Sequence, residues 1–366
     1  MVRTKEFRGM KCRQVGGSGL WLSEVGLGLW KWGDPSYDLS VVGEHEGFKI
    51  LDRALELGVF HWDTANSYNW GSGNSERLLG RYFASRPKQV RSQVVLATKV
   101  RNSVRDEHLE KADFTPNQSG ASRGYIMNAV KDCLERLQTD YIDLLYLHSP
   151  VLNEDGSYGI PLDETWSAMD DLISQGKVYY LGVSNHTSSQ VRDVLDSLDQ
   201  VGKDSSRKLA VIQNNYNLLE RNEVSGKKDA PGPGGEKEFL DFCRDNRIGI
   251  VPLMPLASGM LTGRYRRDNL DKVQGKIILD NMQERYFKEY NFRVVEMLEE
   301  FANEKGITMP HLAAAWLLSH EQLSSVITGV TKMEHLEDNV QATNVKLSDK
   351  DLDRIERILQ EAKETE

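Results

Sequence analysis

Apolar and polar positions along the chain follow two alternating periods. Short apolar runs, typical of strands, are separated by longer stretches in which apolar residues recur every three or four positions, as on one face of a helix. Several runs are apolar at nearly every position, which is typical of parallel strands buried on both faces. The expected strands are Glu24–Gly28, Val59–Asp63, Val94–Lys99, Ile142–His148, Val178–Ser184, Val211–Asn214, Ile248–Met254 and Val326–Thr328.

Amphipathic stretches fill the intervals between these runs. Examples are HEGFKILDRALELG, SRGYIMNAVKDCLERLQ and LDETWSAMDDLISQG. Eight strand–helix units in 366 residues favour an α/β fold of the (β/α)8 TIM barrel type over an open sheet. A doubly wound sheet is the alternative fold. Because no linker-like segment divides the chain, we expect a single domain over residues 1–366.

Three segments fit neither period, and each follows the expected carboxyl end of a strand. They are RNSVRDEHLEKADFTPNQSGAS, SPVLNEDGSYGIP and NLLERNEVSGKKDAPGPGG. Their Gly, Pro, Asn, Ser and charged residues are typical of loops. Barrel enzymes build their active sites at this end of the strands, so we expect long loops on the C-terminal face to shape a site. Tolerated surface insertions are the alternative.

Composition and charge argue against several classes of protein. The formal charge of −9 disfavours a nucleic-acid partner, which needs a basic surface. We expect no membrane partner and a cytoplasmic location, since no apolar run has spanning length and the start, MVRTKEFRGMKCRQ, lacks the apolar core of a signal peptide. Cys12, Cys133 and Cys243 are scattered, so neither a disulfide framework nor a zinc site is indicated. Cys133 and Cys243 lie in helical patterns and are expected in the core.

Polar residues end three consecutive expected strands. Asp63, Lys99 and His148 end the second, third and fourth strands, and Tyr68 lies in the loop after Asp63. Each has an ordinary structural explanation when taken singly, such as a strand-end lysine that reaches solvent. Consecutive strands are neighbours in a barrel, however, so these four groups are expected to meet at one place. Their convergence favours a catalytic site.

The four side chains suit a specific chemistry. A phenol has an unperturbed pKa of about 10, too high for efficient proton transfer at neutral pH. A nearby ammonium is expected to lower the pKa of Tyr68, and a carboxylate to hold that ammonium charged and in place. Asp63, Lys99 and Tyr68 are therefore a candidate proton donor, with His148 placed to hydrogen-bond a substrate oxygen. A tyrosine acid suits carbonyl reduction, and the hydride it requires implies a nicotinamide cofactor.

A series of motifs resembles the aldo-keto reductase superfamily. In chain order they are FHWDTANSY, VLATKV, DYIDLLYLHSP, LGVSNH, VIQNNYNLLER, PLMPLASGMLTGRY and VITGVTKMEHLEDN. The resemblance is greatest to the branch with aryl-alcohol dehydrogenases and potassium-channel β subunits, and it runs from about Ser23 to the final helix. It implies a barrel with a catalytic tetrad of Asp63, Tyr68, Lys99 and His148. The channel β subunits commonly carry Asn in place of the histidine, so His148 favours an enzyme.

The resemblance also places a dinucleotide, with NADP(H) preferred and NAD(H) as the alternative. Ser184 and Asn185 match the pair that holds the nicotinamide carboxamide, and Tyr216 matches the ring on which the nicotinamide stacks. The small residues of segment 254–263 allow a pyrophosphate to approach the backbone, and segment 329–339 matches the part that grips the adenosine phosphate. The matching positions are Trp30, Asp63, Ser184, Asn185, Gln213, Tyr216, Met254, Pro255, Leu256, Ala257, Ser258, Gly259, Leu261, Gly263, Arg264, Gly329, Thr331, Lys332, His335, Asp338 and Asn339.

Some of these positions depart from the family pattern. Met254 replaces the usual Ser, Thr331 stands where Arg or Ser is common, and His335 stands where Gln is usual. For His335 and Asp338 a solvated helix face is the alternative interpretation. The expected substrate pocket is walled by aromatic side chains and the catalytic histidine; plain packing is the alternative for the tryptophans. Its residues are Trp30, Trp32, Trp70 and His148.

Other enzyme classes lack their signatures in this sequence. No tyrosine is followed by Lys at the fourth position, as a short-chain dehydrogenase requires, and GGSGLWL does not form GxGxxG. The histidines include neither HxH nor HExxH, so no metal site is expected. We therefore predict an NADP(H)-dependent reductase of a small carbonyl substrate. The alternative is a regulatory protein, similar to a channel β subunit, that binds NADP(H) and turns over slowly.

Overall fold

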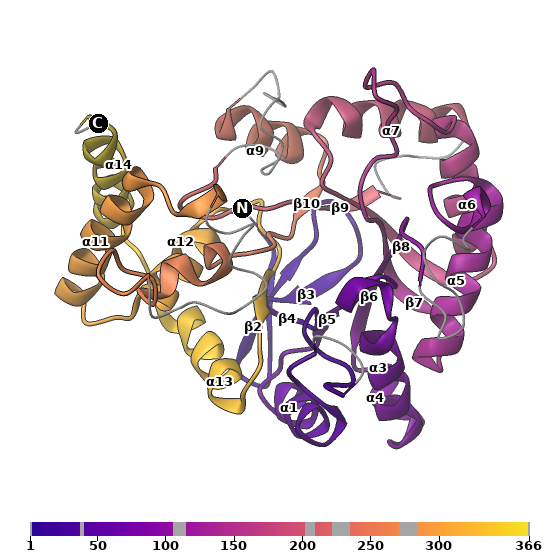
Figure 1. Cartoon of the computed structure of the whole chain (residues 1–366), viewed down its shortest axis with the longest axis horizontal. Helices are drawn as coiled ribbons and strands as arrows, with labels where there is room; N and C mark the ends of the chain where they lie inside the picture. The colour runs from indigo at the N-terminus through magenta and orange to yellow at the C-terminus, as the bar shows by residue number, and fades with distance from the viewer. Residues whose placement is uncertain are drawn as a thin grey trace.

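The computed structural model of the chain describes residues 2–36, 40–104, 115–201, 209–221, 235–270 and 284–364. Its centre is an eight-stranded parallel sheet in the order β10-β9-β8-β7-β6-β5-β4-β11, curled so that helices lie outside it (Figure 1). The strands are β4 (Val25–Gly28), β5 (His61–Asp63), β6 (Val95–Val100), β7 (Ile142–Leu147), β8 (Val178–Ser184), β9 (Leu209–Gln213), β10 (Gly249–Ile250) and β11 (Val326–Gly329).

Hydrogen bonds join edge strand β10 to the segment that leads into the other edge strand, β11. The amide of Ile250 in β10 donates to the carbonyl oxygen of Gln322 over 3.0 Å, and the amide of Ser324 donates to Ile250 over 2.8 Å. Ile250 also forms a parallel bridge with Leu323, just before β11. The sheet thus fits the predicted (β/α)8 barrel, and the doubly wound alternative, which needs two open edges, does not apply.

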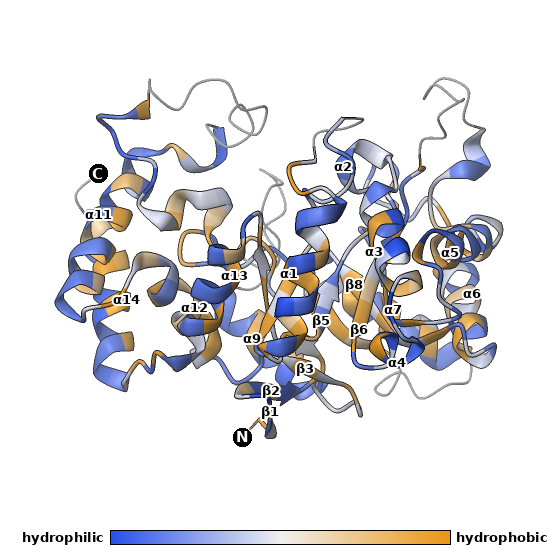
Figure 2. Cartoon of the chain, turned by 90° about the horizontal axis from the view of Figure 1, so that it is seen from below, coloured by the Kyte–Doolittle hydropathy of each residue, from blue (hydrophilic) through white to orange (hydrophobic). Residues whose placement is uncertain are grey.

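Helices cover the outside of the sheet with their apolar faces. In α1, Ile50, Leu51, Ala54 and Leu55 are buried, at the spacing of one helical face. Colouring by hydropathy shows this arrangement throughout, with orange strands inside and blue outer helical faces (Figure 2). The helices are α1 (Glu44–Glu56), α2 (Tyr68–Gly71), α3 (Asn74–Ala84), α4 (Lys88–Arg91), α5 (Arg123–Leu137), α6 (Leu162–Ser174), α7 (Ser188–Gln200), α9 (Glu236–Asp245), α11 (Glu289–Glu304), α12 (Met309–Ser319), α13 (Met333–Gln341) and α14 (Asp349–Glu364), with 3₁₀ turns η2 (Pro116–Gln118), η3 (Ala257–Thr262) and η5 (Ala342–Asn344).

The strands lie where the apolar runs predicted them, with differences at the ends. Strand β8 has the predicted bounds, whereas β10 is shorter than the predicted Ile248–Met254. The chain still runs beside β9 beyond Ile250, since Val251 and Leu253 donate to β9 and the residue after it. Pro252 between them has no N–H to donate, so the regular ladder ends there.

A small antiparallel sheet before the barrel was not predicted. It consists of β1 (Thr4–Phe7), β2 (Met10–Gln14) and β3 (Trp21–Ser23), and lies at the end of the barrel opposite α2 (Figure 2). Val15 and Leu20, in the connection between β2 and β3, and Leu22 of β3 belong to one buried cluster with side chains of the barrel interior. The small sheet therefore fills that end of the barrel with apolar side chains.

Other expectations concern loops, cysteines and membranes. Residues 105–114 and 222–234, which make up much of two expected long loops, lie outside the described residues. In the remaining expected loop, SPVLNEDGSYGIP, Leu152 and Tyr158 form an antiparallel bridge. Cys133 on α5 and Cys243 on α9 are buried in the core, as predicted. Across the described ranges, each helix is too short or too polar to span a bilayer.

Candidate active site

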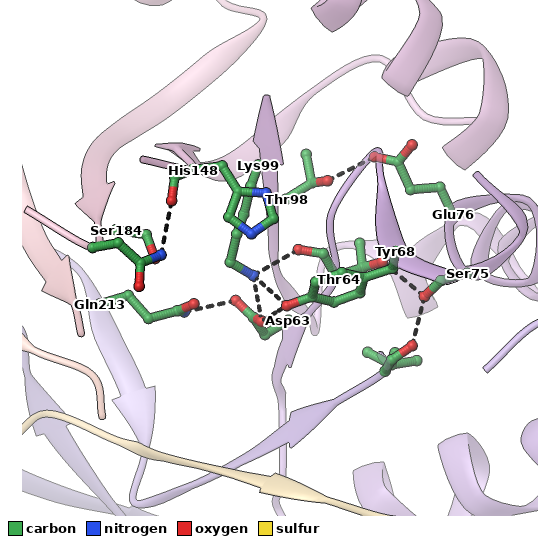
Figure 3. Close-up of polar contacts among 12 residues, drawn as sticks. Asp63, Thr64, Tyr68, Ser75, Glu76, Thr98, Lys99, His148, Ser184 and Gln213 are labelled. Carbon is green, nitrogen blue, oxygen red and sulfur yellow. Dashed lines mark hydrogen bonds and ion pairs between the residues drawn. The ribbon is translucent and has the colours of Figure 1, made fainter. Parts of the chain in front are cut away.

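Asp63, Tyr68, Lys99 and His148 meet at the carboxyl ends of β5, β6 and β7 (Figure 3). The Nζ of Lys99 donates to Asp63 Oδ1 over 2.5 Å and to the Tyr68 hydroxyl oxygen over 2.8 Å. The Tyr68 hydroxyl in turn donates to Asp63 Oδ1 over 3.1 Å. The structure thus brings together the three strand-end residues and the loop tyrosine that the sequence indicated.

The ion pair between Lys99 and Asp63 is buried and fully hydrogen-bonded. Both residues are 1% exposed. Lys99 Nζ also donates to the carbonyl oxygen of Thr64 over 2.9 Å, and Gln213 Nε2 donates to Asp63 Oδ2 over 2.8 Å. Burial lowers the pKa of Lys99 below its ordinary 10.5, an effect that the carboxylate of Asp63 opposes. The pair is held in one geometry because each polar atom has a fixed partner.

The pKa of Tyr68 is shifted in the direction opposite to the prediction. Burial raises it well above the ordinary value of 10, and the nearby carboxylate of Asp63 raises it further. The prediction counted the ammonium of Lys99 but could not count the cost of placing a phenolate in a closed interior beside a carboxylate. Tyr68 is therefore a protonated phenol over the whole physiological pH range.

His148 lies beside Tyr68 with its ring edge-on. The ring centroids are 6.2 Å apart at 72°, and the His148 amide donates to the carbonyl oxygen of Val100 over 3.0 Å. Burial, followed by the charge of Lys99, lowers the pKa of His148 to about 3, so the imidazole is neutral at physiological pH. Its Nδ1 is buried and has no hydrogen-bond partner among the described residues. Because Nδ1 is buried, the other ring nitrogen, Nε2, is the one that can hydrogen-bond a substrate oxygen.

The loop that carries Tyr68 is held in a strained conformation. Asn69 and Trp70 both have left-handed backbone angles, with φ of 53° and 62°. Asn69 is anchored because its Nδ2 donates to Trp32 O and to Ser40 Oγ, both over 2.8 Å. This anchor directs the next side chain outward, and Trp70 is 59% exposed.

The three tryptophans of the expected substrate pocket do not behave alike. Trp30, in the loop after β4, is 49% exposed and Trp70 follows β5, so both are open to a ligand on the face that bears the tetrad. Trp32 is fully buried, and its Nε1 donates to Val330 O over 2.7 Å. Trp32 is a core residue and does not wall a pocket, which corrects that prediction.

The residues expected to hold the carboxamide lie beside the tetrad. Ser184 ends β8, and Asn185 follows it with a left-handed φ of 58°. The Nδ2 of Asn185 donates to His148 O over 2.9 Å and to Ser184 Oγ over 3.0 Å, which leaves its side-chain oxygen as an acceptor. The side-chain amide of Gln213, at the end of β9, donates to Asp63. These contacts tie the carboxamide positions to the catalytic groups.

Tyr216 does not fit the stacking role that the resemblance implied. It is 1% exposed, and its ring packs against Trp316 at 5.4 Å and edge-on to His320 at 5.8 Å. Its hydroxyl donates to Glu236 on α9. Because neighbouring side chains cover the ring, it offers no face to a nicotinamide, and the assignment is corrected. The motifs did not single out Leu253, a half-buried apolar side chain that follows β10. It lies two residues after the inward-facing Val251, so strand alternation places it on the same side of the chain.

Segment 254–263, which follows β10, turns sharply several times. Left-handed φ values recur along it, at the positions Met254, Ala257, Ser258, Gly259 and Gly263. The amides of Ala257, Gly259 and Gly263 donate to carbonyl oxygens within the loop, over 2.9, 2.8 and 3.4 Å, so internal hydrogen bonds close these turns. Ala257 and Leu261 are buried, so their side chains anchor the loop. Pro255 and Leu256 complete the turn, and Arg264 after it is exposed.

The segment expected to meet the adenosine phosphate surrounds the start of α13. Gly329 ends β11, and exposed Lys332 is the N-cap of α13. The ring of His335 lies 3.2 Å from the hydroxyl of Thr331 in the same turn. Asp338 lies 2.9 Å from His311 Nε2, and the side chain of Asn339 is half-buried. Lys332 is thus the exposed cation of this segment, whereas His335 and Asp338 have local partners.

Comparison with known proteins agrees with this geometry. A profile described as Aldo/keto reductase family matches residues 24–360. The chain belongs to the aldo/keto reductase family. It is similar to L-glyceraldehyde 3-phosphate reductase of Escherichia coli, with 28% identity over 365 residues that cover 98% of this chain and 94% of the relative.

Two further relatives match the branches that the motifs indicated. An Arabidopsis thaliana protein named "Probable voltage-gated potassium channel subunit beta" is 31% identical over 96% of this chain and 97% of its own. A Schizosaccharomyces pombe protein that carries the name of an aryl-alcohol dehydrogenase is 30% identical over 93% of both chains. The predicted family is therefore confirmed, and this aldo-keto reductase is an oxidoreductase that acts on carbonyl or alcohol groups. Enzymes of the family generally use NAD(P)H.

Several buried polar residues around the tetrad of this aldo-keto reductase were missed. His61 lies two residues before Asp63 on the same inward face of β5, and its Nδ1 is 2.9 Å from Ser325 Oγ. Strand alternation was the signal that could have found it. Ser75 and Glu76 are fully buried on α3 and contact the strands that bear Asp63 and Lys99 (Figure 3). A polar pair inside an otherwise amphipathic helix was the signal for these two.

Proposed function

We propose that this aldo-keto reductase uses NADP(H) to reduce an aldehyde or ketone to an alcohol, with Tyr68 as the proton donor. The observation that carries the proposal is the hydroxyl of Tyr68, which is hydrogen-bonded to the buried ammonium of Lys99 and to the carboxylate of Asp63. Protonating a carbonyl oxygen requires an acid whose conjugate base is stabilised as it forms. A phenol beside a buried ammonium meets this requirement.

The described residues fit a nicotinamide dinucleotide. Ser184 and the side-chain oxygen of Asn185 can bind the carboxamide beside Tyr68, and the small residues of segment 254–263, with left-handed Gly259 and Gly263, let a pyrophosphate approach the backbone. Lys332, at the N-terminus of the nine-residue helix α13, suits a ribose 2′-phosphate, because helix N-termini favour anions. When bound, the cofactor supplies the hydride.

The protein's own groups then deliver the proton. In this structure the Tyr68 hydroxyl points to Asp63, and rotation about its C–O bond redirects the proton to a substrate oxygen. Lys99 keeps its hydrogen bond to the phenol oxygen during this rotation and stabilises the negative charge that develops there. The neutral ring of His148 orients the substrate oxygen through a ring nitrogen. Because the pKa of Tyr68 is high, its hydroxyl is protonated at the start of each turnover.

Tyr68→Phe tests the proposal directly. We expect wild-type protein to oxidise NADPH with an activated aldehyde, such as a nitrobenzaldehyde, over many turnovers. The variant should lose reduction by 10²–10⁴-fold, because a positioned acid contributes about that much, while dinucleotide binding followed by fluorescence titration stays within about twofold of wild type.

Two results would contradict the proposal. Near wild-type turnover in Tyr68→Phe would exclude Tyr68 as the proton donor. Oxidation of a single equivalent of NADPH by wild type, with no further cycles at saturating aldehyde and cofactor, would instead support the regulatory alternative. A panel of aldehydes and ketones, each assayed with NADPH and NADH at the absorbance of the reduced cofactor, would then define the substrate class.

A further inference from the structure

Two consecutive residues at the start of α3 contact both strands that carry the catalytic ion pair. Thr64 follows Asp63, and its hydroxyl lies 2.8 Å from Ser75 Oγ. Ser75 Oγ donates its single proton to the carbonyl oxygen of Leu29 over 2.9 Å, so the Thr64 hydroxyl must be the donor to Ser75. The neighbouring β4 loop, the end of β5 and α3 thus meet at one serine hydroxyl.

Glu76 makes the matching contact to the next strand. Thr98 precedes Lys99, and its hydroxyl donates to Glu76 Oε1 over 2.6 Å. The other carboxylate oxygen accepts from Arg136 Nε on α5 over 2.7 Å. The Glu76 side chain is fully buried and that of Arg136 is 9% exposed. Strand alternation explains the arrangement, because Thr98 points out toward the helices while Lys99 points into the barrel.

The position of α3 is itself fixed. Gly73, its N-cap, has a left-handed φ of 69° and links α3 to the loop that carries Tyr68. At Gly80 a side chain would collide with the carbonyl oxygen of Arg136, so α3 and α5 are in close backbone contact. Because α3 is fixed in place, its contacts can fix the positions of the two strand ends and of the loop that carries Tyr68.

We propose that Ser75 and Glu76 act as a positioning pair, which we call the α3 clamp, that fixes Asp63, Lys99 and Tyr68 in catalytic register. The proposal rests on the function assigned to these three residues above. Through Thr64 the clamp also fixes the carbonyl oxygen to which Lys99 donates over 2.9 Å. Through Thr98 it fixes the strand position from which Lys99 extends. Neither clamp residue touches the reacting atoms, so both are positioning residues.

The clamp also has an electrostatic effect on Lys99. The carboxylate of Glu76 raises the pKa of Lys99 and so opposes the effect of burial. The other charged or titratable groups that face Lys99 are Asp63, His61, Tyr68, Tyr146 and His148. Removing the charge of Glu76 while leaving these groups in place should therefore make Lys99 lose its proton at a lower pH.

The first test compares two substitutions of Thr98. Thr98→Val is isosteric but cannot donate to Glu76, whereas Thr98→Ser keeps the donor. We expect kcat for a nitrobenzaldehyde with NADPH to fall about tenfold or more in the valine variant, since small displacements of catalytic groups are costly. Both KM values should change by less than about twofold, and serine should restore most of kcat. A valine variant with kcat within twofold of wild type would overturn the proposal.

The second test measures the effect of the Glu76 charge on the pH at which Lys99 loses its proton. Glu76→Gln should move the alkaline decline of kcat to lower pH, and ¹³C NMR of the lysine ε-carbons should show the same displacement for Lys99. The matched control is Glu24→Gln, which breaks an equally buried ion pair, with Arg13 at 2.7 Å, where β4 begins at the other end of the barrel. If Glu76→Gln and Glu24→Gln give the same alkaline decline, the clamp does not act on Lys99.

These outcomes separate the clamp from the proposed function. Absence of wild-type turnover would contradict the function, and the NMR titration of Lys99 would still measure the clamp. Conversely, normal turnover that depends on Tyr68 but is insensitive to Thr98→Val would uphold the function and exclude the clamp. If Glu76→Gln does not fold, as judged by circular dichroism, the two Thr98 variants decide alone.

Discussion

Replacing Lys99 by Met removes one charge from the centre of the site and keeps the length of the side chain. The ammonium lies 2.8 Å from the phenol oxygen of Tyr68, on which negative charge develops as the proton leaves. At an effective dielectric constant of about 20, unit charges at that distance attract by about 6 kcal/mol. This energy corresponds to about 10⁴ in rate. Because the charge on oxygen is partial in the transition state, we expect kcat to fall about 10³-fold.

The substitution also leaves Asp63 buried without its cation. Breaking a buried ion pair from one side costs about 3–5 kcal/mol of stability, so the variant must be shown to be folded before its rate is interpreted. The double variant Asp63→Asn with Lys99→Met removes both charges and should recover most of the lost stability. It should remain slow, because the ammonium that stabilises the phenolate is still missing.

The assay is the pH dependence of kcat, measured with saturating NADPH and aldehyde. Burial places the pKa of Lys99 below 10.5, and the rate should fall as pH rises through that pKa, because the ammonium is lost. Tyr68 does not set this decline, since its own pKa is raised well above 10. Lys99→Met should be slow and show no such decline. Overlapping profiles at similar rates would refute the coupling between Lys99 and Tyr68.

Two further predictions concern cofactor choice and acid stability. Lys332→Glu should raise KM for NADPH by about tenfold and leave KM for NADH within about twofold, because only the phosphorylated ribose meets the reversed charge. Equal effects on both cofactors would show that Lys332 does not contact the phosphate. The same effect from Lys346→Glu, an exposed control, would show this too. Burial lowers the pKa of His61 to about 4 from an ordinary 6.5, so the unfolded state binds more protons between these values, and the free energy of unfolding should fall by up to about 3 kcal/mol as pH drops through that range. Chemical denaturation at several pH values should show a shallower fall in His61→Phe than in the exposed control His45→Gln, and equal slopes would exclude His61 as a source.

The sequence was informative wherever a local pattern had a single structural outcome. Parallel strands buried on both faces must be apolar throughout, so the runs at residues 142–147 and 178–184 were visible as strands. Asp63, Lys99 and His148 stood out because charged or polar side chains at the ends of such runs need a reason. The convergence of their strands then followed from barrel topology.

Long-range packing accounts for what was missed. Tyr216 was assigned a cofactor face, but Trp316 and His320, about a hundred residues later, cover its ring. In the unpredicted strand β2, the buried guanidinium of Arg13 is compensated by Glu24, which no local pattern reveals. The sign of the Tyr68 shift was likewise wrong because it depends on burial, and burial is a property of the assembled barrel.

Apolar side chains close the end of the barrel that bears the small antiparallel sheet, so the active site is expected to open to solvent at the other end. Val15, Leu20 and Leu22 are buried in the interior on the side away from Tyr68 and exclude water from that end. We therefore expect solvent to return a proton to Tyr68 from the carboxyl ends of the strands, where substrate would enter and product would leave. Reprotonation of Tyr68 and release of the alcohol product would then use the same opening. A bulky alcohol that dissociates slowly would delay both steps.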